Sequence, residues 1–123
     1  MALRRVLDHY LRTACAASEL LYPYRDPITL SPPGPLTKPE ELAGREQALD
    51  WFQAEFQVLL GLIRLAAASG FDAYAWQLPW AAAVFLDWRG YWHELAAIQE
   101  LALAAAERLR NPAGQAQARQ YMA

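Results

Sequence analysis

The residues with the greatest capacity for chemistry are two histidines that each lie beside a carboxylate. His9 follows Asp8, and His93 precedes Glu94, with Asp87 nearby. An imidazole and a carboxylate act as a general acid–base pair only when the two groups face one another. Neighbouring residues of a helix point in different directions, so both pairs fail this test. We interpret His93 and Glu94 as part of a solvated turn of helix.

Nucleophilic and metal-dependent chemistry are also disfavoured. Cys15 is the only cysteine and lies in an alanine-rich stretch, a setting typical of close helix packing, whereas a nucleophilic thiolate needs exposure and a nearby base. The sequence contains neither a HExxH pattern nor a cysteine cluster for a metal, and no GxxxxGK[ST] loop for a nucleotide phosphate. We therefore expect a protein that is not an enzyme and that needs no cofactor.

Tryptophan is the least ordinary feature of the composition. The chain has five tryptophans, namely Trp51, Trp76, Trp80, Trp88 and Trp92. A small domain rich in alanine needs large side chains to fill the volume between its helices, which favours a core position for these rings. The alternative is a concave aromatic pocket for an apolar or cationic ligand. A mixture, with some rings buried and one or two exposed, fits both interpretations.

Charge and hydropathy restrict the classes of partner. Eleven Lys and Arg against thirteen Asp and Glu give a net charge of −2, without the basic face that binding to nucleic acid requires. No run of about 18 apolar residues would cross a membrane, and the N-terminus lacks the continuous apolar segment of a signal peptide. A single cysteine excludes an internal disulfide and fits a reducing compartment. We expect a cytoplasmic protein.

Hydrophobic periodicity predicts an all-α fold in one domain, 1–123. Apolar residues at steps of three and four predict a first helix over 1–22 and a second over 44–69. Between them, the proline-rich segment 23–43 is expected to form an extended connection that lies against the helices.

The remaining sequence predicts a helix hairpin over 72–110, with Asp72 as the N-cap of its first helix and Gly90 in its turn. Pro112 then opens another helix, 112–123, which would be the first helix of a further repeat. Together these segments predict antiparallel helix hairpins in a right-handed stack of about five helices.

The segment Trp76–Asn111 resembles one tetratricopeptide repeat of about 34 residues. The positions that match its pattern are the turn glycine, the aromatic residue after it and the alanine–leucine pair of the second helix: Gly90, Trp92 and Ala102–Leu103. Two positions depart from it, because Pro79 stands where the consensus has tryptophan and Gln99 replaces an aromatic residue.

A second resemblance extends over nearly the whole chain. The tracts LDHYLRTACAASELLYPYRDP, REQALDWFQAEFQVLL, AWQLPWAAAVFLDWRGYWHE and ALAAAERLRNPAGQAQAR are similar to the region after the nucleotide-binding module in actinobacterial antibiotic-regulator (SARP) proteins of the STAND or NB-ARC type. In that family this region leads into a tetratricopeptide array and acts as a scaffold and as a sensor or partner-binding portion. The resemblance implies that catalysis and DNA binding belong to other domains.

The leading hypothesis is therefore a non-enzymatic protein-interaction or sensor domain of a transcriptional or signalling regulator. The residues expected to make exposed contacts with a protein segment or a neighbouring domain are Tyr74, Gln77, Trp80, Trp88, Arg89, Tyr91, Trp92 and His93. The alternative is a small-molecule-binding domain or a cofactor-free enzyme that uses the tryptophan-rich helices as an apolar pocket. An open end of the repeat stack also predicts a homodimer through the last helix and the adjacent face of the helix before it.

Overall fold

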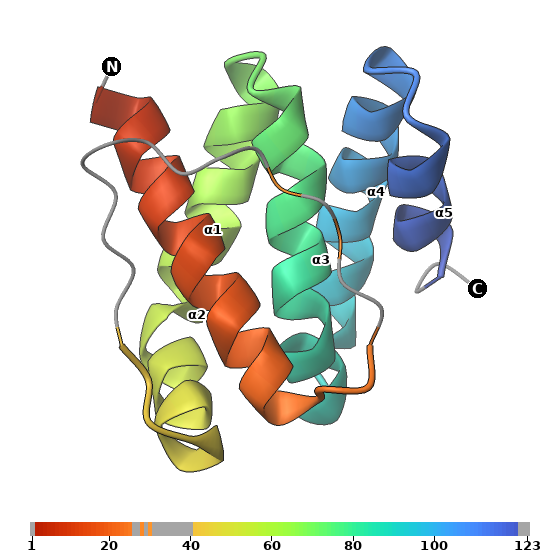
Figure 1. The fold of residues 1–123 in the computed structure, drawn as a ribbon. Helices are drawn as coiled ribbons and strands as arrows, with labels where there is room; N and C mark the ends of the chain where they lie inside the picture. The colour runs from red at the N-terminus through yellow and green to blue at the C-terminus, as the bar shows by residue number, and fades with distance from the viewer. Residues whose placement is uncertain (1, 26–27, 29, 31–40, 121–123) are drawn as a thin grey trace.

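The computed structural model describes residues 2–25, 28, 30 and 41–120, and the regular secondary structure of these residues is entirely helical, with no strand among them. The five helices, drawn in Figure 1, are α1 (Ala2–Leu21), α2 (Arg45–Ala68), α3 (Asp72–Trp88), α4 (Trp92–Arg108) and α5 (Pro112–Arg119). The predicted all-α class is confirmed. Most of the expected proline-rich connection, and the end of the expected last helix at 121–123, lie outside the described residues.

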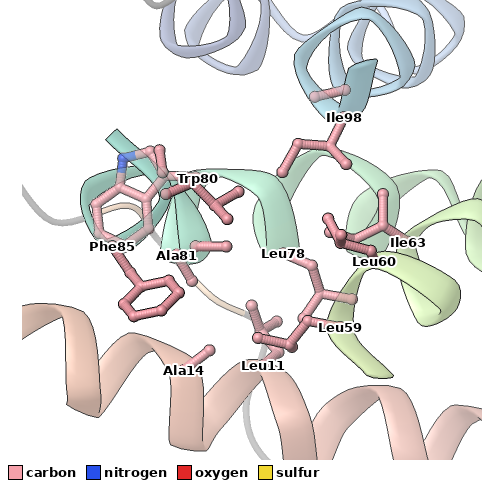
Figure 2. Packing of buried hydrophobic residues seen from close by; sticks show 14 of the residues in the cluster. Leu11, Ala14, Leu59, Leu60, Ile63, Leu78, Trp80, Ala81, Phe85 and Ile98 are labelled. Carbon is pink, nitrogen blue, oxygen red and sulfur yellow. The ribbon is translucent and has the colours of Figure 1, made fainter. Parts of the chain in front are cut away.

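Helix α3 lies at the centre of the fold. It packs against α1 and α2 on one side and against α4 and α5 on the other. Every residue from Ala75 to Leu86 is buried, which is the pattern of a helix that is apolar on all sides. Figure 2 shows the core around it, where Leu11 of α1, Leu59 of α2 and Ile98 of α4 approach α3.

The start of α3 differs from the prediction in its N-cap. Phe71 occupies the N-cap position, and Asp72 is the first residue of the helix. The turn before α3 is so short that only Phe71 separates the helix from Gly70, whose φ is +79°. The carboxylate of Asp72 instead accepts hydrogen bonds from Nε and Nη2 of Arg108, at 3.0 and 2.8 Å. This contact joins the start of α3 to the end of α4, and the hydrogen bond to Asp72 raises the pKa of Arg108.

The same tight turn joins the helices three times, at intervals of twenty residues. Gly70, Gly90 and Arg110 all have positive φ, at +79°, +77° and +53°. In each turn the next amide donates a 2.9 Å hydrogen bond across the end of the preceding helix: Phe71 N to Ala66 O, Tyr91 N to Leu86 O, and Asn111 N to Ala106 O. These bonds satisfy carbonyls that the helix end would otherwise leave open. One helix and its turn therefore form a recurring unit of twenty residues from α3 onward.

Of the three residues with positive φ, only Arg110 carries a side chain, and residues with a side chain rarely adopt this conformation. The turn at Arg110 is therefore strained, whereas those at Gly70 and Gly90 are not. We expect Arg110→Gly to raise the free energy of unfolding by about 1 kcal/mol, measured by denaturant titration. Arg110→Ala removes the same charge but keeps a Cβ, so it should give no such gain. Equal stabilisation by both variants would contradict the conformational explanation.

Helix α5 packs on α3 and α4 through a glycine. Asn111 caps this helix by accepting a 3.0 Å hydrogen bond from the amide of Gly114, and Pro112 stands in its first turn. A Cβ at Gly114 would lie 3.0 Å from Cδ2 of Trp76 and 3.1 Å from Cβ of Ala106. The backbone of α5 therefore rests directly against the Trp76 indole.

In the described part of the expected connection, Ile28 and Leu30 are half-buried and pack on the core as predicted, whereas Tyr24 is 85% exposed. Within the described residues, no helix combines the length and the apolar character needed to cross a membrane.

Candidate interaction surface

The residues expected to make exposed contacts differ in their burial between the α3–α4 turn and the middle of α3. Trp88, at the end of α3, is 45% exposed, and Trp92, at the start of α4, is 66% exposed. Arg89 and His93 are exposed as well. By contrast, Gln77 and Trp80 are 9% and 8% exposed, so the expectation that they are exposed is corrected. The physical reason is the central position of α3, whose middle is covered on all sides.

The five tryptophans are a mixture of buried and exposed rings. Trp51, Trp76 and Trp80 are buried and fill volume between the helices, whereas Trp88 and Trp92 lie at the surface. The core interpretation therefore accounts for three of the five rings.

An exposed group of aromatic side chains lies where the end of α1 meets the end of α3. Tyr22 and Tyr24 follow α1 and are 44% and 85% exposed. The ring of Tyr22 contacts those of Tyr24 and Trp88 edge to face, with centroids 5.9 and 6.3 Å apart. The guanidinium of Arg45, at the start of α2, lies 5.0 Å from the Trp88 ring centroid. We call Tyr22, Tyr24, Trp88 and Trp92 the aromatic surface.

The two tyrosines of this surface are not among the residues predicted to make exposed contacts, and their exposure departs from the expectation that the connection lies against the helices. Tyr22 and Tyr24 flank Pro23, so the local sequence indicates an interrupted helix with aromatic residues beside the break. It does not indicate which side of the fold the rings face, because that depends on the packing of α1 against α3.

A second group of aromatic residues, the aromatic stack, holds the α3–α4 turn against α2. Tyr91, in the turn, lies parallel to Phe56 with centroids 4.8 Å apart, and Phe85 lies parallel to Phe52 at 5.0 Å. The Tyr91 hydroxyl also accepts a 3.4 Å hydrogen bond from Nε2 of Gln53. Stacked and edge-to-face rings add to the stabilisation from burial. The turn that carries Trp88 and Trp92 is therefore anchored to α2.

Tyr74, the remaining expected contact residue, is half-buried and joins α3 to α1. Its hydroxyl donates a 3.2 Å hydrogen bond to Oδ1 of Asp8, a buried carboxylate that also accepts from Nε of Arg12 at 3.3 Å. Burial raises the pKa of Tyr74. These contacts assign Tyr74 a structural role.

The potential metal ligands of the described residues are dispersed over the fold. Among the described residues, no group of three or more His, Cys, Asp or Glu side chains lies close enough to hold a metal ion. His93 is exposed, and the Asp8 carboxylate beside His9 is bound to Tyr74 and Arg12. The chemistry that the site favours is contact through aromatic rings and exposed guanidinium groups.

Cys15 should react slowly with alkylating reagents in the folded protein. Burial raises the pKa of its thiol to about 12, against an opposing effect of Arg12, and the thiolate is the reactive form. At pH 8.5 we expect iodoacetamide to label the native protein at least about ten times more slowly than the protein in denaturant. Because the folded thiol has the higher pKa, its contribution to stability is present below pH 9 and decreases as the pH rises towards 12. Equal labelling rates in the two states would contradict this burial.

No protein-family model matches the chain, and comparison with the curated proteins and with the solved structures gave no match either.

Proposed function

We propose that this chain is a non-enzymatic protein-interaction or sensor domain of a transcriptional or signalling regulator, and that its aromatic surface binds a protein segment or a neighbouring domain. The observation that carries the proposal is the exposure of Tyr24, Tyr22 and Trp88, which are linked by ring contacts through Tyr22, together with the exposure of Trp92 at the start of α4. Large apolar side chains that a fold leaves uncovered mark interaction sites when they gather in a patch.

The composition of the surface suits protein recognition. Tryptophan, tyrosine and arginine are the residues that most often dominate binding energy in protein interfaces. Trp88 and Trp92 stand on either side of a turn that the aromatic stack holds against α2, so little conformational freedom is lost when a partner binds. Arg45 places a guanidinium beside the Trp88 ring, and the exposed Arg89 follows Trp88 in the chain. A partner segment with apolar side chains flanked by carboxylates would match both features.

The proposal extends to the architecture of a helical repeat. Successive antiparallel helices joined by one recurring turn support a right-handed, tetratricopeptide-like stack in which α5 is the first helix of the next hairpin. Two of the twenty-residue units give a hairpin repeat longer than the 34 residues of the tetratricopeptide pattern, which favours a variant with longer helices. The regulator assignment and the cytoplasmic location rest on the sequence tracts and the lone cysteine described above.

Selection of binding peptides tests this proposal. A displayed library of random peptides is panned on the immobilised domain, and each enriched peptide is then titrated against the wild type and two variants. We expect Trp88→Ala to weaken binding at least about tenfold, since truncating a dominant interface residue costs about 2 kcal/mol or more. Leu109→Ala is the matched control, because Leu109 is also 45% exposed but lies in the α4–α5 turn. Enriched peptides that bind both variants as tightly as the wild type would contradict the proposal.

The alternative function is a small-molecule-binding domain or a cofactor-free enzyme built on the buried tryptophans. One observation favours it: within the described part of the chain, the buried indole Nε1–H of Trp80 has no hydrogen-bond acceptor. A polar ligand group would supply one, and the guanidinium of Arg25 lies 3.9 Å from the centroid of the same ring. Saturable quenching of tryptophan fluorescence by a natural product, lost in Trp80→Phe and kept in Trp88→Phe, would favour this function over the interaction domain.

A further inference from the structure

Helix α2 carries an apolar stripe that none of the other described helices covers. Its members are Ala54, Val58, Gly61, Leu65 and Ala68, all of them exposed. They recur at steps of four and three residues, the spacing by which one helix meets another along a shared seam. Val58 and Leu65 are 44% and 46% exposed, and both rank among the large apolar side chains that the fold leaves at the surface.

Gly61 at the middle of this stripe is not explained by the packing of the chain itself. It stands inside the 24-residue helix α2, where glycine is a poor helix former. A Cβ placed on Gly61 would meet no atom within 4 Å, in contrast to Gly114, where a side chain has no room. A glycine at an exposed helix position is explained if a second backbone approaches there, because the absence of a side chain lets two helices come close.

We propose that α2 packs antiparallel against α2 of a second copy of this chain, about a two-fold axis that passes beside Gly61. The stripe is nearly symmetric about this residue, as a contact between identical surfaces requires. In the antiparallel arrangement Gly61 meets Gly61 of the second copy, Val58 meets Leu65, and Ala54 meets Ala68. Val58 and Leu65 then contact each other at the sides of the interface. The small residues Ala54, Gly61 and Ala68 lie where the two helices approach most closely.

The polar residues beside the stripe have the same symmetry. Arg64 is the only charged residue among the exposed positions of α2 from 53 to 68. In the antiparallel pair its guanidinium lies beside the side-chain amide of Gln57 of the second copy, whose oxygen accepts hydrogen bonds. The pairing therefore places no two like charges in contact, which favours a second copy as the occupant.

The open end of the repeat stack is a weaker candidate for self-association. The exposed residues of α5 and its caps are small or polar, namely Pro112, Ala113, Ala116, Arg119 and Gln120. Among the described residues, the exposed large apolar side chain nearest to α5 in the sequence is Leu109, in the turn before this helix. Self-association through α2 is independent of the proposed function, but it would give each dimer two aromatic surfaces and so strengthen binding to a partner with two matching segments.

Two glutamate substitutions distinguish these surfaces. Gly61→Glu places like charges at the crossing point, and Ala116→Glu places the same charge on exposed α5. In sedimentation equilibrium we expect the wild type to form a concentration-dependent dimer in the micromolar range, because one helix face is a small interface. Gly61→Glu should be a monomer with a raised melting temperature at low protein concentration, since glutamate is the better helix former. Ala116→Glu should dimerise like the wild type.

A cross-linking experiment tests the geometry of the pair. In a Cys15→Ala background, Gly61→Cys should form a disulfide between two copies on mild oxidation, and Ala116→Cys should not, because only residues near the two-fold axis meet their own equivalents. The proposal is overturned if the wild type remains a monomer into the millimolar range, if Ala116→Glu and not Gly61→Glu abolishes the dimer, or if Gly61→Cys fails to cross-link in a dimer.

Discussion

Phe85→Ala should lower the free energy of unfolding by about 3–5 kcal/mol, which is a large part of the total stability of a small domain. Phe85 has no exposed area and lies parallel to Phe52, with centroids 5.0 Å apart. Its ring also contacts Phe56 and Tyr91, at 6.0 and 6.1 Å. Removing it leaves a cavity between α2 and α3 and takes away the support of the α3–α4 turn. Denaturant titration followed by circular dichroism measures the loss.

The matched control for this prediction is Trp88→Ala, three positions later on the same helix. Trp88 is 45% exposed, so the structure predicts a loss of about 1 kcal/mol or less although a larger side chain is removed. Similar losses for the two variants would show that burial does not distinguish these positions and would contradict the assignment of Phe85 to the core.

Gly114→Val should detach α5 from the rest of the fold. A Cβ at this position lies 3.0 Å from the Trp76 ring, and valine adds two more carbon atoms against a buried indole. Overpacking of this kind costs about 1–3 kcal/mol, which an eight-residue helix at the edge of the fold cannot balance. We expect fast amide hydrogen exchange across α5, and a red shift of the fluorescence as Trp76 becomes exposed.

Ala113→Val provides the comparison for Gly114→Val, because Ala113 is the preceding residue of α5 and is exposed. The substitution introduces the same side chain without the collision, and it lowers helix propensity, whereas Gly114→Val raises it, so α5 should stay protected from exchange in Ala113→Val. Protection of α5 that persists in Gly114→Val would contradict direct packing of its backbone on Trp76.

The helices themselves followed from local sequence, because their signals are local. Apolar periodicity predicted an all-helical chain, and the structure confirms this class. The N-cap at Asp72 was predicted wrongly, since a side chain that can cap a helix was expected to do so, whereas Asp72 lies inside the first turn and binds Arg108 across the hairpin. That ion pair depends on where α4 ends in space, which the residues around Asp72 do not reveal.

The candidate surface was harder to predict, because exposure depends on which helix occupies the centre. Trp80 and Trp88 are both aromatic residues of α3, yet one is 8% exposed and the other 45%. Trp80 lies in the middle of α3 with the Arg25 guanidinium 3.9 Å from its ring centroid, whereas Trp88 is the last residue of the helix. The surroundings of the glycines could not be predicted from the local sequence either. Gly61 faces open space and Gly114 faces Trp76, although both lie within helices.

The central claim, that the aromatic surface serves binding and not folding, is tested most directly by one double variant, Trp88→Ala with Trp92→Ala. Its affinity for a peptide selected on the wild type and its free energy of unfolding are measured on the same preparation. Because both rings are exposed, we predict that the affinity falls at least about a hundredfold, while stability falls by no more than about 2 kcal/mol. A variant that loses most of its stability but binds the peptide as tightly as the wild type would contradict the claim.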